Sequence, residues 1–370
     1  MKTATYIFIT NTDYSSKNLT GAHKRFLELL VDASKTKKVI LISKEIPQIK
    51  GLHITNYQLN DKYIQFLPKH INKILSITKK LRRIKNAIKY DYSISFGPVD
   101  TICYGLSGYR NIVTLFREDY IEYKKALGIK GIKLHYAMLQ EKYAVKHSQK
   151  IIVQCRDDKN NLIKRYGEDI RGKIYVQINN ANASWIKKNN DKTKKHESAI
   201  RIAFIGNFTD KRKGHGILLP AMARIINHNK NVELVVAGDG KELQQYKNRY
   251  RSYSRIKFIG HVNNANELLN SCSLEIVPSL IDSCPNTLLE GLNAGIAVYG
   301  SNVGGIKDIL KEKEYLFEPN SESIYSLINK VINEKRYISD AKKQKTIVKK
   351  LSFDWSNKIF SIIERNKWII

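Results

Sequence analysis

Short continuous runs of apolar residues recur along this chain, and segments with helical spacing lie between them. Residues 6–9 and 39–42 are two such runs, and residues 23–34 between them place Phe26 and Leu30 on one helical face. Continuous apolar strands that alternate with helices are typical of parallel sheets covered on both faces. The same pattern predicts further strands over residues 92–96, 112–115, 150–154, 201–205, 232–237, 256–259, 274–277 and 296–299. We therefore expect an α/β fold.

The alternation restarts after a polar segment, residues 187–198, which has the composition of a linker. A chain of 370 residues is also too long for one ordinary core, so two domains are expected. We predict one Rossmann-like domain over residues 1–190 and a second over residues 200–350. A final helix within residues 352–370 is predicted to pack back on the first domain. Two such domains leave a cleft at the carboxyl ends of their strands, where α/β sheets bind ligands.

Charge and cysteine content narrow the class of protein. The chain has 64 basic and 34 acidic residues, a net charge of +30, which implies a polyanionic partner such as nucleic acid, anionic lipid or a phosphorylated substrate. Its four cysteines lie far apart without a C-x-x-C pair, so we expect no metal site and a reducing cytosol. Residues 1–10 alternate like a strand, which does not indicate a signal peptide. No run approaches the ~18 apolar residues of a membrane span, so we expect a soluble or peripheral protein.

The segment from residue 277 to 310 carries the clearest chemical signal. Asp282 lies on a predicted loop after a buried strand, and Glu290 lies on the helix that follows. Ser283-Cys284-Pro285-Asn286 between them form a predicted helix N-terminus, and Gly304-Gly305 follow later. A carboxylate binds sugar hydroxyls, and the free amides of a helix N-terminus bind phosphate. A nucleotide sugar offers both groups, so the segment predicts a nucleotide-sugar site.

Together with other motifs, this segment makes the second half of the chain resemble the retaining GT-B glycosyltransferases of family 4. The resemblance runs from Ile202 to about Leu310, and the first half of the chain resembles the family more weakly. The motifs stand in the family's order: Ile205-Gly206-Asn207-Phe208, Lys213-Gly214, Val236-Ala237-Gly238-Asp239-Gly240, Phe258-Ile259-Gly260-His261-Val262, Pro278-Ser279, and Asp282 with Glu290 as an E-x7-E motif that starts with aspartate. Glycine turns are common singly, but these motifs in register are specific.

The resemblance implies a GT-B fold, in which two Rossmann-like domains face one another across a cleft. The first domain would bind the acceptor and the second a nucleotide diphospho-sugar, expected to be UDP-linked. The implied reaction transfers the sugar to a glycan or lipid-linked acceptor with retention of anomeric configuration, without a metal or a separate cofactor. The expected setting is bacterial cell-surface polysaccharide synthesis, on the cytoplasmic face of the cell membrane.

The resemblance also implies roles for individual residues. Lys213 would neutralise the diphosphate, Glu290 would accept hydrogen bonds from the ribose, and Asp282 would bind the donor sugar. Each also has an ordinary interpretation, as a solvated lysine, a solvated helix acid and a turn aspartate. The expected donor contacts are otherwise Gly21, Gly206, Asn207, Arg212, Gly238, His261, Ser283, Cys284, Pro285, Asn286 and Thr287.

The chain departs from the family at several of these positions. Asn207 stands where the family usually has arginine, which removes one cation, and Lys211 or Arg212 is the candidate replacement. Asp282 is one methylene shorter than the family's glutamate, which is expected to alter how the donor sugar is seated. Gly21 lies in Thr20-Gly21-Ala22, which resembles the family's first glycine loop but also suits an ordinary turn or cap.

The family's histidine after the strand at residues 112–115 is absent here. Phe116-Arg117-Glu118-Asp119 takes that position. We expect Arg117 or Glu118 to act on the acceptor side, with a charged loop as the ordinary alternative.

Residues 67–89 form a basic amphipathic helix. Apolar residues recur there at helical spacing from Leu67 to Ile88, beside lysines and arginines such as Lys73, Lys79 and Arg82. Such a helix can lie on an anionic bilayer, whereas most bury their apolar stripe in their own domain. Both can hold at once, and we expect association with an anionic membrane surface.

Two other classes of protein compete with the transferase. A nucleotide-sugar epimerase of the same architecture would need its own acid and base residues, and the Asp282 and Glu290 spacing with Lys213 favours the transferase. A nucleic-acid-binding protein is suggested by charge alone. The sequence has neither a recognisable binding module nor a polybasic tail, so no nucleic-acid partner is expected.

Overall fold

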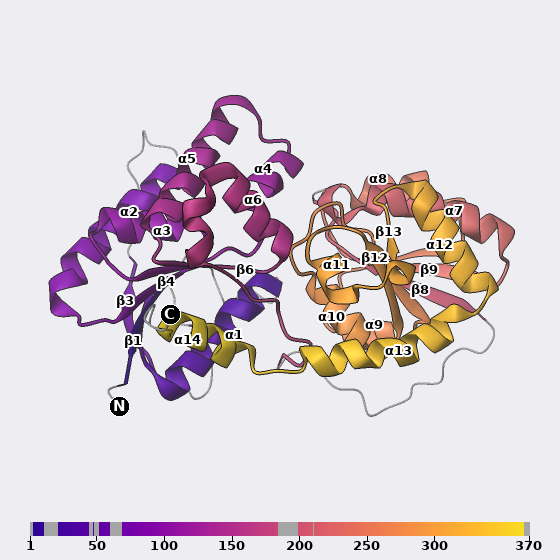
Figure 1. The fold of residues 1–370 in the computed structure, drawn as a ribbon. Helices are drawn as coiled ribbons and strands as arrows, with labels where there is room; N and C mark the ends of the chain where they lie inside the picture. Colours follow the sequence, from indigo (N-terminus) through magenta and orange to yellow (C-terminus); the bar gives the residue numbers. More distant parts are fainter. Residues whose placement is uncertain are drawn as a thin grey trace.

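The computed structural model describes residues 3–10, 21–43, 47, 52–59, 69–183, 199–209 and 211–365. These residues form two α/β domains that lie side by side (Figure 1). The first sheet has the strand order β3-β2-β1-β4-β5-β6-β7, and the second has the order β10-β9-β8-β11-β12-β13. Neighbouring strands are parallel throughout. This is the doubly wound Rossmann order in both domains, and it confirms the predicted fold class.

The first domain contains a seven-stranded sheet. Its strands are β1 (Thr5–Ile9), β2 (Lys38–Ser43), β3 (Thr55–Gln58), β4 (Tyr92–Ser95), β5 (Ile112–Leu115), β6 (Lys150–Val153) and β7 (Ile174–Val176). Its helices are α1 (Gly21–Thr36), α2 (Lys69–Ile84), α3 (Pro98–Leu106), α4 (Tyr120–Ala126), α5 (Gly131–His147) and α6 (Arg156–Tyr166), with short 3-10 helices η1 (Lys85–Ala87) and η2 (Glu168–Lys173).

The second domain has a six-stranded sheet. Its strands are β8 (Ile200–Ile205), β9 (Val232–Ala237), β10 (Ile256–Gly260), β11 (Leu274–Val277), β12 (Ala297–Ser301) and β13 (Leu316–Phe317). Its helices are α7 (His215–His228), α8 (Leu243–Arg249), α9 (Ala265–Asn270), α10 (Asn286–Asn293), α11 (Gly304–Leu310), α12 (Ser321–Asn333) and α13 (Arg336–Leu351), with 3-10 helices η3 (Lys211–Lys213) and η4 (Lys313–Tyr315).

Strand β1 shows why these apolar runs become central strands. Its side chains alternate between the two faces of the sheet, as the period of two requires. Tyr6 and Phe8 enter the core that contains α1 residues such as Leu29, whereas Ile7 and Ile9 enter the core under α2 and α3. Both faces are therefore covered, and residues 6–9 of the strand form a continuous buried run.

The chain returns to the first domain through α14 (Trp355–Glu364), which packs beside α1 (Figure 1). Trp355, Ile359 and Phe360 are buried in the same core as β1. The buried Lys150 ammonium donates hydrogen bonds to the carbonyl oxygens of Ile362 and Ile363, at 2.8 Å each, and so satisfies the C-terminal end of the helix. The predicted end of this helix at residue 368 lies outside the described residues.

Arg25 of α1 holds the two chain segments that cross between the domains. Its guanidinium is buried and donates to the Asn180 carbonyl oxygen at 2.8 Å and to the Asn180 side chain. The Asn180 side chain donates in turn to the carbonyl oxygen of Phe353 at 2.9 Å. Arg25 also lies over the Trp355 ring. The predicted boundary near residues 190–200 falls largely outside the described residues.

The basic amphipathic helix predicted over residues 67–89 is α2, continued by η1. Ile77 and Leu81 are fully buried against the sheet, and Ile74 and Ile84 are buried as well. The prediction that the apolar stripe belongs to the core is therefore confirmed.

The pattern missed the strands at the sheet edges: β3, β7 and β13 are only two to four residues long. Two or three residues are too few for a pattern of apolar positions to develop in β7 and β13. Strand β3 is as long as several predicted strands, but it is mostly polar and none of its residues is buried.

Glu275 is an exception within the second core. It lies in β11 between Leu274 and Ile276, it is fully buried, and neither carboxyl oxygen has a hydrogen-bond partner among the described residues. It occupies space left by Gly291, where a Cβ atom would lie 1.9 Å from Glu275 Oε2. Burial, with a smaller contribution from Glu290, raises the pKa of Glu275 well above its usual range. The carboxyl group therefore keeps its proton at neutral pH.

Replacing Glu275 with methionine is expected to raise the free energy of unfolding at neutral pH by about 1–3 kcal/mol, because two unpaired buried oxygens are removed. The difference should widen at alkaline pH, since a raised folded-state pKa means that wild-type stability falls as pH rises through it. Urea denaturation measures this. The exposed Glu334 provides the control, and Glu334→Met should change stability by less than about 0.5 kcal/mol. A less stable Glu275→Met protein would contradict this account.

Candidate active site

The site lies where the strand order of the second sheet reverses. Strands β8 and β11 are neighbours there, with Ile202 paired to Leu274, although about 70 residues separate them along the chain. The loop after β8 carries Lys213, and the loop after β11 carries Asp282. Loops at the carboxyl ends of strands at such a switch point form the ligand crevice of α/β sheets.

Lys213 and Asp282 meet in this crevice. The Lys213 ammonium lies 2.6 Å from Asp282 Oδ2, and the side chains are 23% and 8% exposed. The Ser279 hydroxyl donates to the same Asp282 oxygen at 3.4 Å. The structure thus places the two groups predicted for the diphosphate and the donor sugar within one ion pair.

Gly214 fixes the position of Lys213. Its φ is +75°, and a Cβ atom there would lie 1.7 Å from the carbonyl oxygen of Pro278. The backbone N–H of Leu280 donates to the carbonyl oxygen of Arg212 at 2.7 Å. Only glycine permits this approach and this backbone conformation, so the 3-10 turn that contains Lys213 is packed directly on the loop that leads to Asp282.

The two glycine turns predicted from sequence lie against each other. Gly238 has φ of +145°, and a Cβ atom on it would lie 1.8 Å from the Gly206 carbonyl oxygen. Glycine at position 238 therefore lets the two turns pack into one continuous floor. Asn207 beside this floor is exposed, and its side-chain oxygen accepts from the N–H of Thr209. His261 is also exposed and directly follows Gly260, whose carbonyl oxygen accepts from Gly238 N–H at 2.8 Å.

Two helix N-termini face each other across the cleft. Gly21 begins α1 and Asn286 begins α10. A Cβ atom on Gly21 would lie 2.1 Å from the Asn286 side-chain nitrogen, so the helix starts are in contact. Helix N-termini carry partial positive charge and unpaired N–H groups. The cleft between the domains therefore favours an anion.

Glu290 lies in α10, one turn beyond this helix start. Burial raises the pKa of its carboxyl group to about 7, opposed by the nearby cations Lys24 and Arg25 of α1. No described residue donates a hydrogen bond to this carboxylate or forms an ion pair with it. A partly buried acid without a partner is able to accept hydrogen bonds from a ligand.

Two side chains between Asp282 and Glu290 bind residues that precede the linker. The Ser283 hydroxyl donates to Asp158 Oδ1 at 2.9 Å. Asn286 accepts a hydrogen bond from Asn179 at 3.3 Å, and Cys284 is buried. Pro285 caps the start of α10, and Thr287 lies in its first turn. These contacts leave the backbone amides of the segment as its means of binding an anion.

Arg212 reaches across the cleft. Its guanidinium lies 3.4 Å from Glu118 and over the ring of Tyr123 at 4.9 Å, both in the first domain. Burial raises the pKa of Glu118, and the nearby Arg212 opposes that rise. Lys211 is exposed. Of the two candidate replacements for a cation at Asn207, Arg212 is therefore the one that bridges the domains.

A cavity of about 380 Å³ opens on the first-domain side of the cleft. It collects charged side chains that sequence reasoning missed, namely His23, Lys73 and Asp100. Burial raises the pKa of Asp100 to about 6, and burial with the charge of Arg117 lowers the pKa of His23. These residues come from α1, α2 and α3, so no local pattern joins them.

Residues of the segment Phe116–Asp119 point in different directions: Arg117 and Glu118 line the cavity, whereas Phe116 and Asp119 are buried. The Arg117 guanidinium donates to the Ala22 carbonyl oxygen at the start of α1. Asp119 instead caps α4 by accepting from Glu122 N–H at 3.1 Å, and it pairs with Arg165 at 3.0 Å. Phe116 also borders the cavity but is buried in the core.

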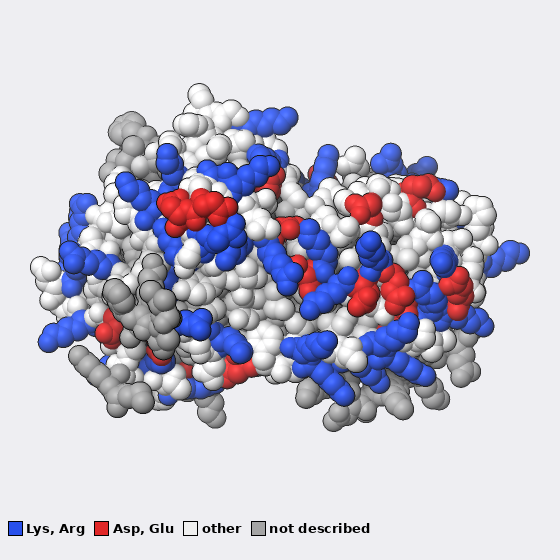
Figure 2. Space-filling model, in the orientation of Figure 1, with Lys and Arg blue, Asp and Glu red and all other residues white. Residues whose placement is uncertain are grey.

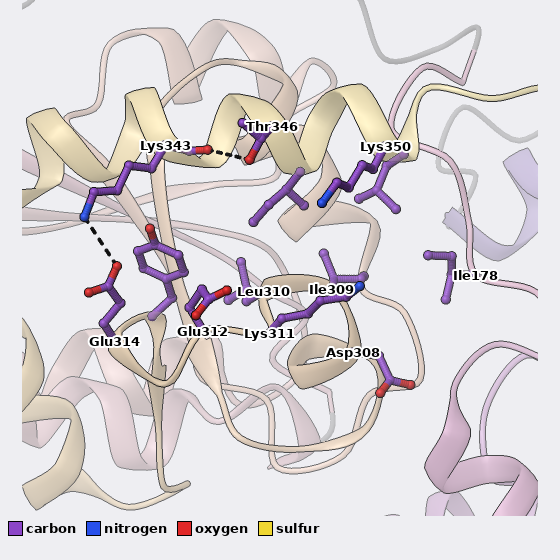
Figure 3. A pocket seen from close by; sticks show the side chains of 13 residues that line it. Ile178, Asp308, Ile309, Leu310, Lys311, Glu312, Glu314, Lys343, Thr346 and Lys350 are labelled. Carbon is purple, nitrogen blue, oxygen red and sulfur yellow. Dashed lines mark hydrogen bonds and ion pairs between the residues drawn. The ribbon is translucent and has the colours of Figure 1, made fainter.

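A larger cavity, of about 570 Å³, is lined mostly by the second domain and also by Ile178, which follows β7 (Figure 3). It opens between α11, η4 and α13, and Lys343 pairs there with Glu314 at 3.6 Å. Lys311 and Lys350 are balanced by Asp308 and Glu312 in its lining. None of the predicted donor contacts lines this cavity.

Two further findings concern the described residues. No helix among them is long and apolar enough to cross a membrane. No group of three or more histidine, cysteine, aspartate or glutamate side chains among them is arranged to hold a metal ion.

The fold and the cleft define the class of architecture. HepE from Anabaena, solved in complex with UDP and glucose, matches with a TM-score of 0.73 at 17% identity over 98% of this chain and 99% of that one. Sucrose-phosphate synthase from Thermosynechococcus elongatus matches with a TM-score of 0.78 at 13% identity, over 97% and 98%. Identities this low show the fold alone, and they confirm the predicted GT-B fold.

Sequence comparison adds a family model and relatives. Residues 199–334 match the model described as "Glycosyl transferases group 1". The chain is 29% identical to Protein CapJ of Staphylococcus aureus over 203 residues, 53% of this chain and 50% of that protein. It is 25% identical over 317 residues, 81% of this chain and 78% of that protein, to the UDP-Gal:alpha-D-GlcNAc-diphosphoundecaprenol alpha-1,3-galactosyltransferase of Escherichia coli. The chain spans half to three fifths of the length of the first curated relatives it matches.

Gly214→Ala should destabilise the second domain and move Lys213 away from Asp282, because the new methyl group would overlap the Pro278 carbonyl. Gly128→Ala is the matched control: Gly128 has φ of +76°, yet nothing lies within 4 Å of a Cβ atom there. Both variants carry the cost of a left-handed alanine, about 1–2 kcal/mol. Gly214→Ala should lose about 1–3 kcal/mol more, as measured by urea denaturation. Equal losses in the two variants would contradict the packing role of Gly214.

Proposed function

We propose that this protein is a retaining glycosyltransferase of family 4 that moves a sugar, a hexose in the simplest case, from a nucleotide diphospho-sugar to a glycan or lipid-linked acceptor. The observation that carries the proposal is the ion pair between Lys213 and Asp282 at the switch point of the second sheet. The match of residues 199–334 to group 1 glycosyl transferases supports it. The family and its relatives do not favour an epimerase.

The donor binds mostly to the second domain. The diphosphate lies on the Gly206 and Gly238 floor, between the N-termini of α1 and α10, and Lys213 neutralises it. Glu290 accepts hydrogen bonds from the ribose hydroxyls. A base expected to be uracil lies toward His261 at the end of β10. HepE, a structural neighbour of the same fold, was solved with UDP and glucose.

Asp282 binds Lys213 before the donor arrives and the donor sugar afterwards. Without a donor it pairs with Lys213, which holds both side chains in position. When the diphosphate arrives, its charge competes for the Lys213 ammonium, and the Asp282 carboxylate becomes available to the hydroxyls of the donor sugar. The pair thus pre-organises a cation and an anion for opposite ends of one ligand.

Transfer breaks the bond between the anomeric carbon and the leaving phosphate oxygen. Lys213 and the amides at the start of α10 stabilise the negative charge that develops there. The acceptor oxygen bonds to the same face of the sugar, and its proton passes to the leaving phosphate oxygen. This scheme needs no metal and no dedicated base, so chelator-sensitive activity would count against it.

The acceptor enters the first-domain cavity beside Arg117 and Glu118. The E. coli relative is named for a GlcNAc-diphosphoundecaprenol acceptor, which supports a lipid-linked acceptor here. We place the protein at the inner face of a bacterial cell membrane, in the synthesis of cell-surface polysaccharide. Protein CapJ and the E. coli relative, both from bacteria, support this setting.

Lys213→Ala should lower the rate of sugar transfer by about 100- to 1,000-fold, as expected when one group that stabilises developing charge is removed. Lys211→Ala is the matched control, since Lys211 is exposed two residues away and should keep near-normal activity. Transfer of labelled sugar to a membrane-extract acceptor measures both, and NMR of the product gives its anomeric configuration. Near-normal activity of Lys213→Ala, or an inverted product, would refute the assignment.

Nucleotide binding should strengthen as pH rises through about 7, the pKa that burial gives Glu290. A carboxylate accepts stronger hydrogen bonds than a neutral acid, so affinity should rise about fivefold to tenfold from pH ~6 to ~8. Calorimetric titration with UDP measures this. Glu290→Gln should show only the pH dependence of the nucleotide itself, and Glu290→Ala should abolish transfer while remaining folded. A folded Glu290→Ala protein with normal activity, or a Glu290→Gln protein with the wild-type pH dependence, would contradict the assignment to ribose.

A further inference from the structure

The tip of the first domain formed by residues 126–139 is an exposed apolar surface. It comprises the end of α4, the connecting turn and the first half of α5. Ile132 is 90% exposed and Leu139 is 51% exposed, and Leu127, Tyr136 and Met138 are also exposed. Single exposed apolar residues are normal on a protein surface, whereas a group of five within one tip marks an interaction site.

Helix α5 has two apolar faces. Ala137, Ala144 and Val145 are buried on the inner face against the domain. Ile132, Tyr136 and Leu139 recur at i, i+4 and i+7, which places them on one outer stripe. Packing of α5 against the domain requires apolar residues on its inner face only. The exposed apolar residues on the outer stripe therefore do not contribute to that packing.

Lysines surround this stripe. Between residues 120 and 139 the sequence has Lys124, Lys125, Lys130 and Lys133 against one acid, Glu122. Glu122 pairs with Lys125 at 2.7 Å, whereas Lys130 and Lys133 are exposed and form no ion pair with any described residue. Figure 2 shows an uncharged surface at this tip, with Lys and Arg side chains beside it. Apolar side chains ringed by cations are complementary to an anionic lipid bilayer.

The tip also lies close to the first-domain cavity beside Arg117 and Glu118, which we propose for the acceptor. Helix α4 begins at Tyr120, which lines that cavity, and it contacts η3 of the second domain. Its seven residues span about 10 Å at 1.5 Å per residue. A bilayer at the tip would therefore hold lipid headgroups about one short helix away from Arg117 and Glu118.

We propose that the apolar tip, residues 126–139, is the surface by which this protein docks on an anionic membrane. Ile132 and Leu139 enter the interfacial region, Tyr136 lies at the headgroup level, and Lys130 and Lys133 contact anionic headgroups. This inference deepens the membrane part of the proposed function. It assigns insertion to α5, because α2 buries most of its apolar stripe and exposes only Leu75 among its large apolar side chains that the structure describes.

Sedimentation with vesicles tests the proposal on the full chain. Wild-type protein should bind vesicles of phosphatidylcholine with phosphatidylglycerol, more weakly as salt is raised, and should bind phosphatidylcholine alone far less. The double variant Ile132→Ser, Leu139→Ser should lower the affinity about tenfold or more. Ile338→Ser is the matched control: Ile338 is 48% exposed, but it lies on α13 in the second domain, and it should leave the affinity within about twofold.

Three outcomes would overturn the proposal. The first is wild-type protein that does not bind the anionic vesicles. The second is loss of binding in an α2 variant, Leu75→Ser with Lys79→Glu, while the tip variant still binds. The third is self-association of the wild-type chain that the tip variant abolishes, since the tip would then contact a second copy. UDP binding by the tip variant should stay at the wild-type level, and its loss would indicate damage to the donor site. If the wild-type protein and every variant fail to bind UDP, that result refutes the proposed function and not the membrane proposal.

Discussion

The ion pair between Lys213 and Asp282 is the constraint on which the site depends. Its two residues come from loops that follow adjacent parallel strands, so the sheet itself brings them together. The approach of Gly214 to the Pro278 carbonyl then leaves no room for either loop to shift. A partly buried lysine beside a carboxylate is satisfied without a ligand, yet both groups are oriented for one. The rest of the cleft supplies what the pair lacks: amides for the remaining phosphate charge and Glu290 for hydroxyls.

Several polar contacts join the first domain to the second. Buried Arg25 binds both segments that cross between the domains. Near the cleft, Ser283 donates to Asp158, and Arg212 reaches Glu118. Burial raises the pKa of Asp158 to about 7, and the Ser283 hydrogen bond opposes that rise. These contacts place the helix starts of α1 and α10 against each other, so the start of α1 reaches the anion site only when the two domains are held in this arrangement.

The sequence predicted the central strands because they are buried on both faces and are therefore continuous apolar runs, as in residues 6–9 of β1. It also predicted that Asp282 and Lys213 belong to one site, because the family resemblance assigned them to the sugar and the diphosphate of one donor. It could not predict that the side chains of Ser283 and Asn286 would bind Asp158 and Asn179, because those partners are more than 100 residues away. His23, Lys73 and Asp100 were missed for the same reason. Each lies on a separate helix, Lys73 was assigned only to the basic face of its helix, and only the fold brings the three into one cavity.

The most direct test is a calorimetric comparison of a nucleoside diphosphate with the monophosphate of the same base, beginning with UDP and UMP. The account predicts that UDP binds at least about tenfold more tightly than UMP, a difference of about 1.4 kcal/mol, because only the diphosphate reaches both the start of α10 and Lys213. In Lys213→Ala this preference should disappear, while UMP affinity stays unchanged. No binding of any nucleoside diphosphate, or an unchanged preference in Lys213→Ala, would contradict the claim that this cleft is a donor site built on Lys213.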